Sequence, residues 1–250
     1  MRRRFFVERF DGAAAVLQGE SAAHLARVLR AEPGQLYELS DGRTAWLARV
    51  ESAERDAVRF ALVEPLPATE PALRVCLLLS IVKFDRFEWC LEKATELGVA
   101  EIVPLAATHT DKPLLAAAGK RWARWEQILA ESAQQSRRLR PPVLRGAFDG
   151  VRSNEIPSPM WPEAAFAHSA ATCKILLSER REAKPIRDVL TVYAEPTAAL
   201  AIGPEGGWTE GEFESAAHAG FAEASLGENI LRTETAVVAA LAILRFALGD

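Results

Sequence analysis

The sequence predicts an α/β protein with a mostly parallel sheet over residues 71–250, preceded by a small β-rich domain over residues 1–70. Three observations predict this organisation. After residue 71, apolar runs of strand length alternate with amphipathic helical segments, the pattern of parallel strands joined by helices. Before it, short alternating segments are separated by turn signals. Between the two parts, Pro65, Pro67 and Pro71 indicate a linker at about residues 65–72.

In the first part, residues 36–39 and 44–50 flank the dipeptide Asp41-Gly42, which is a strong signal for a β-hairpin. Residues 58–63 have the composition of another strand. Residues 21–29 predict one short helix, with Ser21 as its N-cap.

In the second part, residues 73–82 form a continuous apolar run, as expected for a buried parallel strand. The next helix covers residues 87–97 and ends before Gly98, in the C′ position that favours glycine. Further strands are expected at residues 100–105, 165–167, 175–177, 198–202 and 224–226. Further helices are expected at residues 120–138, from the N-cap Thr209 with Glu212 as its capping-box partner to Gly220, and at residues 233–248.

Composition excludes several classes of protein. The chain contains no run of about 18 apolar residues, the length that a membrane helix needs. Its basic N-terminus lacks the apolar region of a signal peptide, so we expect a cytoplasmic protein. Cys76, Cys90 and Cys173 lie far apart in apolar runs and form no metal-ligand spacing with the histidines. Buried free thiols are therefore expected, and neither zinc nor a disulfide.

The formal net charge of −4 by itself argues against a nucleic-acid partner. Residues 120–145, however, contain seven lysines and arginines against only Glu126 and Glu131. A local basic patch can bind phosphates on an acidic protein, because binding depends on the local potential. The alternative is a helix C-terminus enriched in cations, with Trp122 and Trp125 as core residues.

Residues 202–207 place three glycines directly after a predicted strand. Such a loop either approaches a partner closely or needs positive φ angles. In open α/β sheets, ligands bind beyond the carboxyl ends of strands. The spacing fits neither a dinucleotide fingerprint nor a P-loop, and the loop has no lysine for a phosphate. The sequence therefore indicates a ligand met by backbone groups, as adenine or ribose would be, or simply a tight turn.

Residues 226–236 form a second glycine-bearing segment between a strand and a helix, and it contains Arg232 and Glu234. Two such loops at two strand ends would form two walls of one pocket. Thr233 or Thr235 would also serve as a helix cap. Lys83 and Arg86 follow another strand end, where they predict either contact with RNA or a solvated turn.

Together these segments resemble the ribosomal RNA small subunit methyltransferase E family of the SPOUT superfamily. The resemblance spans essentially the whole chain. It is carried by His24-Leu25, residues 28–30, Val82-Lys83, Asp85-Arg86, Glu88-Trp89, residues 93–99, Gln135-Ser136, Arg138, residues 202–207, Leu226-Gly227 and residues 230–236.

The resemblance implies S-adenosylmethionine-dependent methylation of N3 of uridine 1498 in 16S rRNA of the small ribosomal subunit. It also implies a PUA-like β-barrel that binds RNA at residues 1–70, and a SPOUT methyltransferase domain with a deep trefoil knot at residues 71–250. No pattern argument from sequence would propose a knot. Family members are homodimers, and the apolar helix at residues 236–248 is the candidate contact.

Carried over residue by residue, the resemblance implies three sets of site residues and no metal. The cofactor set is Leu177, Ile202, Gly203, Pro204, Glu205, Gly206, Leu226, Gly227, Ile230, Leu231, Arg232, Thr235 and Ala236. The RNA set is Arg2, Arg3, Arg4, Arg30, Lys83, Arg86, Gln135, Arg137 and Arg138. For catalysis, Arg232 and Arg138 would stabilise the uracil N3 anion, and Glu234 would orient an arginine or accept the proton.

The chain departs from the family pattern at Phe84, at Trp208 and at Thr110-Asp111. The first and third departures concern the substrate side. Three alternatives stay open: a SPOUT enzyme with another RNA target, an RNA-binding module without catalysis, and, more distantly, a dehydrogenase. Primer-extension arrest at one uridine tests the first, and titration with S-adenosylmethionine tests the second.

Overall fold

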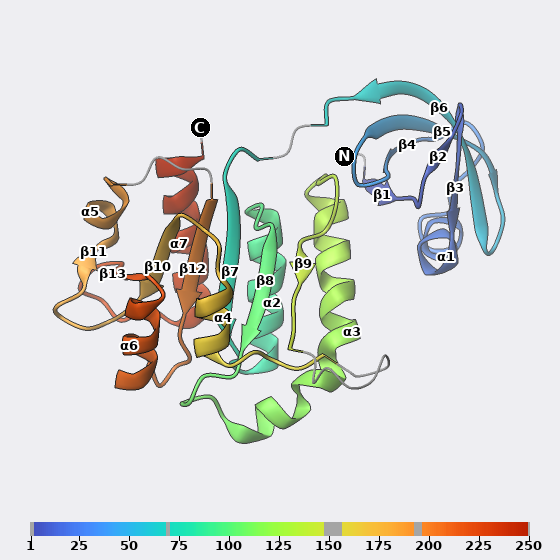
Figure 1. Cartoon of the computed structure of the whole chain (residues 1–250). Coiled ribbons are helices and arrows are strands. Elements are labelled where there is room, and N and C mark those ends of the chain that lie inside the picture. The colour runs from blue at the N-terminus through green and yellow to red at the C-terminus, as the bar shows by residue number, and fades with distance from the viewer. Residues whose placement is uncertain (1–2, 69–70, 148–156, 193–196, 250) are drawn as a thin grey trace. The chain divides into compact units, whose positions relative to one another are not determined.

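The computed structural model describes residues 3–68, 71–147, 157–192 and 197–249 (Figure 1). The chain divides into two compact units. The first comprises Met1–Glu70 and Ala130–Pro141, and the second comprises Pro71–Leu129 and Pro142–Asp250. Among the described residues, no helix combines the length and the apolar character needed to cross a membrane.

The first unit is a curled six-stranded sheet with one short helix, α1 (Gly19–Arg27). The strand order is β1-β4-β5-β6-β3-β2, and only β1 and β4 pair in parallel. The strands are β1 (Arg4–Phe6), β2 (Phe10–Asp11), β3 (Ala14–Gln18), β4 (Leu36–Ser40), β5 (Ala45–Ala53) and β6 (Ala57–Leu66). Phe5, Leu25, Leu39 and Phe60 are fully buried and belong to one apolar core.

The predicted hairpin is confirmed as β4 and β5. Gly42 has a φ of +85°, and the Asp41 carboxylate accepts hydrogen bonds from the amides of Arg43 and Thr44 at 2.9 and 2.8 Å. The predicted cap of α1 is wrong: the helix begins two residues before Ser21, and its N-cap, Gln18, makes no side-chain capping bond. Strand β6 continues through Pro65, so regular structure extends into the predicted linker.

The second unit is built on a seven-stranded sheet in which every strand pair is parallel, as the alternation of strands and helices predicted. Its order is β11-β13-β10-β12-β7-β8-β9. The strands are β7 (Arg74–Ser80), β8 (Glu101–Leu105), β9 (Val143–Leu144), β10 (Cys173–Leu177), β11 (Lys184–Pro185), β12 (Thr197–Ile202) and β13 (Ala222–Ser225).

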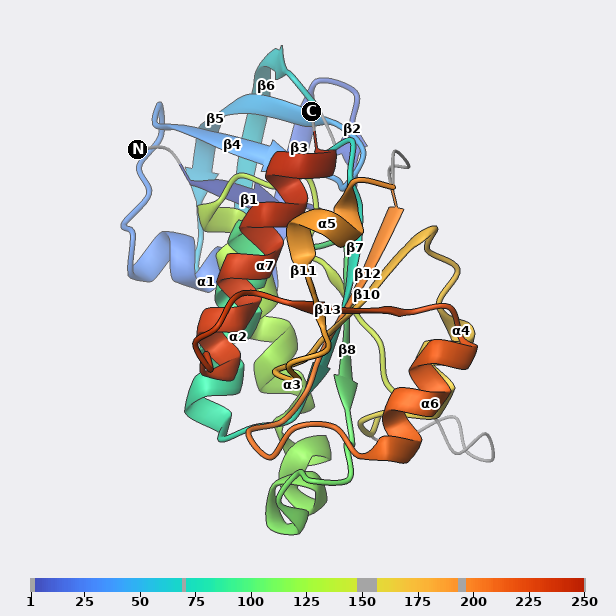
Figure 2. The ribbon, with the colours of Figure 1, turned by 90° about the vertical axis from the view of Figure 1, so that its left-hand side faces the viewer.

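Successive residues of these strands face two different cores, because side chains alternate across a strand. Leu77 and Leu200 belong to one cluster with α2 (Phe84–Glu96), α3 (Lys112–Gln135) and α7 (Thr233–Leu248). Leu78 and Ala199 belong to the other, with α4 (Pro162–His168) and α6 (Glu210–His218). Figure 2 shows the sheet between these two layers of helices. Burial on both faces explains the continuous apolar runs in the sequence.

Several predicted bounds are corrected. Helix α3 begins eight residues earlier than predicted, at Lys112, and ends at Gln135, shortly before Arg137 adopts a φ of +57°. Residues 165–167 were predicted as a strand but belong to α4, which has a proline in its first turn. Periodicity cannot distinguish a short strand from a short buried helix. The short elements β9, β11 and α5 (Ile186–Leu190) gave no sequence signal.

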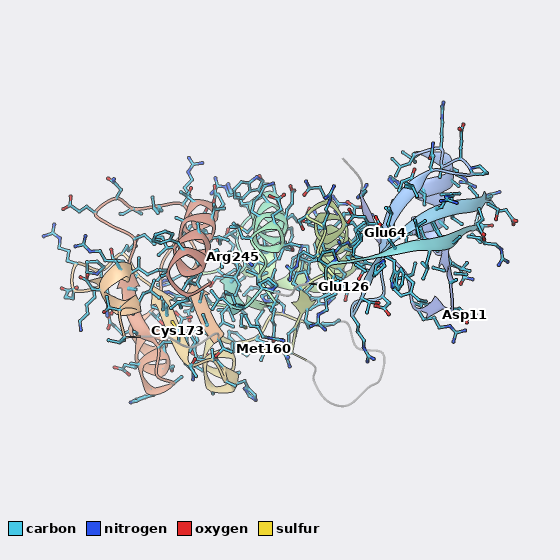
Figure 3. All side chains as sticks on the ribbon, turned by 90° about the horizontal axis from the view of Figure 1, so that it is seen from above. Asp11, Glu64, Glu126, Met160, Cys173 and Arg245 are labelled. Atoms are coloured by element: carbon cyan, nitrogen blue, oxygen red, sulfur yellow. The ribbon has the colours of Figure 1, made fainter. Side chains whose placement is uncertain are left out.

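Two of the three cysteines, and the two tryptophans of helix α3, are core residues, whereas Cys76 is only partly buried. Cys90 and Cys173 are buried free thiols, and burial raises the pKa of Cys90 to about 12, so this thiol stays protonated and inert at neutral pH. Trp125 is buried against Phe87 and Trp122 against Trp125, so neither ring can stack on RNA bases. The C′ prediction for Gly98 holds, with a φ of +78°. Arg245 extends from α7 (Figure 3), and its guanidinium lies against Gly98.

Candidate active-site cavity

A cavity of about 580 Å³ lies where the carboxyl ends of three neighbouring strands, β13, β10 and β12, release their loops. This is the position in which open α/β sheets bind ligands, and the volume is typical of small-molecule sites. Its lining consists of Arg86, Leu177, Ser178, Glu179, Arg180, Ile202, Gly203, Pro204, Glu205, Gly206, Gly207, Trp208, Glu210, Phe213, Leu226, Gly227, Glu228, Asn229, Ile230, Leu231, Arg232, Thr233 and Ala236.

The residues that were predicted to bind the cofactor line this cavity, with the exception of Thr235. Thr235 is exposed in the first turn of α7. A third wall, expected from the family resemblance at residues 176–178, is formed by Leu177 and Ser178 at the end of β10. The structure extends this wall with Glu179 and Arg180 and with Phe213 on α6, which sequence reasoning missed.

The glycines of the first loop make room mainly for the protein itself. A Cβ at Gly203 would lie 3.0 Å from the Trp208 ring, and one at Gly206 would lie 2.9 Å from Cβ of His109. Gly207 has a φ of +70°, and its amide donates to the Pro204 carbonyl at 2.9 Å. The loop is thus a tight turn and a cavity wall at once. The tight turn is confirmed, and a ligand met by the backbone of this loop stays a prediction.

Two side chains attach this loop to its surroundings. The buried Trp208 donates its indole N–H to the carbonyl of Leu177 at 3.0 Å, which joins the first loop to the end of β10. On the other side, His109 Nδ1 lies 3.1 Å from the Gly207 carbonyl. The tryptophan that departs from the family pattern is therefore an integral part of the cavity wall.

Glu212 is a fully buried carboxylate behind the loop. Its oxygens accept hydrogen bonds from the amide of Thr108 at 2.9 Å, and from the amide and hydroxyl of Thr209 at 2.7 and 2.9 Å. The bond from the Thr209 amide, together with the Glu212 amide donating to the Thr209 hydroxyl at 3.3 Å, forms the capping box that the sequence predicted for α6. Glu212 therefore links the loop after β8 to the helix that follows the first glycine loop.

We expect Glu212→Ala to lower the free energy of unfolding by about 2 kcal/mol, because it removes a buried carboxylate that accepts from the amides of Thr108 and Thr209 and caps helix α6. Urea unfolding followed by circular dichroism measures this change. Glu210→Ala is the matched control in the same helical turn, since the Glu210 side chain is 79% exposed. Equal stability of the two variants would contradict the role given to Glu212.

Three arginines line the cavity, and the structure distinguishes them. Arg86 forms an ion pair with Glu205. Arg180 pairs with Glu210 and stacks over the Phe213 ring, with Cζ 3.9 Å from the ring centroid. The Arg232 guanidinium makes no ion pair or hydrogen bond with any other described residue. Arg232 is thus the cavity cation whose charge is available to a substrate.

The other two residues predicted for catalysis do not line the cavity. Glu234 Oε1 lies 3.9 Å from Nε of Arg86, and its Oε2 is buried without a hydrogen-bond partner in the described structure. Arg138 belongs to the first unit. Of the three residues predicted for catalysis, Arg232 is therefore the one that lines the cavity.

The chain matches the model of the RNA methyltransferase domain family over residues 69–245. It is 34% identical over 245 residues to ribosomal RNA small subunit methyltransferase E of Mycobacterium bovis, covering 95% of this chain and 88% of the relative. The chain belongs to the ribosomal RNA small subunit methyltransferase E family. The resemblance predicted from its motifs is confirmed, and the chain is an rRNA methyltransferase.

Other members of the family agree along nearly the whole chain. The methyltransferase E of Synechocystis is 30% identical, covering 94% of this chain and 74% of the relative. The crystal structure of the Neisseria gonorrhoeae methyltransferase E bound to S-adenosyl methionine superposes with a TM-score of 0.83 at 29% identity, covering 100% of this chain and 99% of that one. A Legionella pneumophila methyltransferase in complex with the same cofactor gives the same values.

The residues that were predicted to bind RNA differ in how accessible they are to solvent. Arg2 lies outside the described residues. Arg4 is buried: its guanidinium donates twice to Glu38, at 3.2 and 3.0 Å, and once to the carbonyl of Arg137 at 2.6 Å. These contacts engage all three guanidinium nitrogens of a buried side chain, so we reinterpret Arg4 as a structural residue. Arg3 is partly buried, with its Nε inaccessible to solvent.

Arg30, Lys83, Gln135 and Arg137 are exposed. Arg30 and Arg137 have φ angles of +50° and +57°, a conformation that non-glycine residues rarely adopt and that is often found at functional sites. No other non-glycine residue of the described chain has a positive φ. Arg138 is half-buried.

In the folded chain, acidic side chains neutralise part of the positive charge that the sequence shows at residues 120–145. Arg121 and Arg124 lie 3.4 and 3.8 Å from the carboxylate of Glu88. Arg145 pairs with Glu101, and Arg137 lies 3.6 Å from Glu38. The fold therefore brings acidic partners from distant positions to this segment.

Proposed function

We propose that this chain methylates N3 of uridine 1498 in 16S rRNA, using S-adenosylmethionine. The family supports the coarser statement, an S-adenosylmethionine-dependent rRNA methyltransferase. The observation that carries the proposal is a cavity between two glycine loops, lined by Arg232, which has no ion pair among the described residues.

The chemistry of the cavity fits the cofactor. Leu177, Ile202 and Leu226 provide apolar wall for an adenine ring. The backbone amides of residues 228–231 make no hydrogen bond to the described protein and remain available as donors. Carboxylates of Glu179, Glu210 and Glu228 line the same cavity and suit a ligand that carries positive charge. When bound, S-adenosylmethionine supplies a methyl group activated by a positively charged sulfur.

The chain must then favour the loss of the uracil N3 proton to solvent water, because the methyl group takes its place on N3. Uracil is neutral at N3 at physiological pH, and the charge of its anion spreads onto the O2 and O4 oxygens. A cation held beside either oxygen lowers the pKa of N3 and stabilises the charge that develops. We assign this role to Arg232, at the entry of helix α7. The helix N-terminus adds a partial positive charge in the same place.

We further propose that residues 1–70 are a PUA-like β-barrel that holds the RNA, and that residues 71–250 are a SPOUT domain with a trefoil knot. The exposed Arg30, Gln135 and Arg137, together with Arg138, support an RNA-binding role for the first unit. We also propose a cytoplasmic homodimer. Ile230 and Phe246 support this assembly, because 78% and 92% of their surfaces are exposed at the two ends of the apolar α7 segment.

Primer extension on 16S rRNA, with nucleoside mass spectrometry, tests the function. Small subunits from cells that lack the gene should contain unmodified uridine 1498, and the purified protein with S-adenosylmethionine should restore the extension arrest and 3-methyluridine. Arrest at a different nucleotide would reassign the target. Full modification in cells without the gene would refute the proposal.

A further inference from the structure

We infer that Arg86 is a positioning residue that fastens the first glycine loop, through Glu205, to the start of helix α7, through Glu234. This inference rests on the proposed function only where it concerns cofactor affinity. It reassigns Arg86 from RNA binding to the cavity wall. Of the two roles predicted for Glu234, it keeps the orientation of an arginine and drops the acceptance of the proton.

The topology brings these three residues together. Strands β7 and β12 are parallel neighbours, with Leu79 opposite Ile202. Helix α2 follows β7, and the first glycine loop follows β12, so Arg86 in the first turn of α2 lies beside Glu205. Helices α2 and α7 also contact each other, which places Glu234, in the first turn of α7, on the other side of Arg86.

The Glu234 side chain contacts helix α2 and does not line the cavity. Its Oε2 is buried without a hydrogen-bond partner in the described structure, and the residue is not part of the cavity lining. The pKa of the Cys90 thiol, one turn beyond Arg86 on α2, is raised to about 12, first by burial and then by the charge of Glu234. The carboxylate therefore faces the interior of the α2–α7 pair.

The charge balance argues against phosphate binding by Arg86. One guanidinium shared by two carboxylates forms a cluster with a net negative charge, which has little attraction for RNA. Lys83 lies three residues earlier, at the N-cap of α2; it is exposed and has no ion pair among the described residues. Lys83 is thus the cation of this segment that suits RNA, and it offers a matched control.

Isothermal titration of the whole protein with S-adenosylmethionine, without RNA, tests the inference. Arg86→Met should raise the Kd for the cofactor about tenfold, an effect of the size usually measured for residues that share one ion-pair network. Arg86→Lys should restore part of the affinity. Combining Glu234→Gln with Arg86→Met should weaken binding no further than Arg86→Met alone, because Glu234 acts through Arg86. Hydrogen exchange of residues 203–207 in the cofactor-free protein should accelerate in Arg86→Met.

RNA affinity measured across a salt series separates the two roles. Lys83→Met should reduce the salt slope by about one and leave the cofactor Kd unchanged, whereas Arg86→Met should leave the slope unchanged. The inference is overturned if Arg86→Met reduces the slope and binds cofactor normally. It is equally overturned if Glu234→Gln abolishes turnover at normal cofactor affinity.

The two hypotheses fail differently. Absence of cofactor binding by the unmodified protein would refute the proposed function, while the hydrogen-exchange comparison would still decide whether Arg86 holds the loop. Should Arg86→Met fail to fold, Arg86→Gln removes the charge in the same measurements with a polar side chain in its place.

Discussion

Replacing Arg232 with alanine is expected to lower the rate of methyl transfer by about 10²–10³-fold, the usual effect of removing one group that stabilises developing charge. The reason is local: Arg232 lines the cavity, and its guanidinium has no partner among the described residues that would already neutralise it. The free energy of unfolding should stay nearly unchanged. Arg232 is the N-cap of α7 but makes no side-chain capping bond, and its carbonyl still accepts from the Ala236 amide in the variant.

Single-turnover methylation of small ribosomal subunits at saturating cofactor measures this effect, with the cofactor Kd and thermal unfolding as checks. A loss in the rate with little change in the Kd indicates an interaction made mainly in the transition state. Arg187→Ala is the control, because Arg187 is an exposed arginine of the same unit outside the cavity lining. Wild-type rates in Arg232→Ala would remove the central residue of the proposed mechanism.

The parts of the fold that were predicted correctly are those with local signals. Helix α7 has the predicted bounds, Thr233–Leu248, and the capping box of α6 was recognisable from Thr209 and Glu212 alone. Strand β12 was recognisable because burial on both faces leaves an uninterrupted apolar run. The same rule failed at residues 165–167, where three apolar residues in a row carry no period at all.

The cavity was predicted in part, because glycine-bearing loops after strands are visible in a sequence. The ion pairs were not, because each joins residues that are distant along the chain. In the sequence, Arg4 belongs to a basic N-terminal segment, but in the folded chain it forms a buried ion pair with Glu38. The arginines of residues 120–145 likewise meet Glu88 and Glu101, which lie outside the segment. A charge count over one segment therefore overestimates the positive potential available to RNA.

Gly227→Ala is the second change with a large expected effect, a rise of about 10- to 100-fold in the Kd for S-adenosylmethionine. Gly227 lines the cavity with a φ of +127°, a conformation that an L side chain avoids at a cost of about 1–3 kcal/mol. Space is not the obstacle, since a Cβ there would meet no atom within 4 Å. Alanine will instead relax the backbone away from this φ. Cofactor binding then has to restore the strained conformation, and the strain energy is subtracted from the binding energy.

Gly34→Ala separates this effect from a general loss of stability. Gly34 has a φ of +92°, is equally unobstructed, and belongs to the first unit, outside the cavity. Both variants should therefore unfold at lower urea concentrations than the unmodified protein, because both replace a glycine where φ is positive. Only Gly227→Ala should weaken cofactor binding by titration. Equal cofactor affinities in the two variants would contradict this prediction. The positive φ of Gly227 would then serve only to turn the chain toward α7 and would not shape the cofactor site.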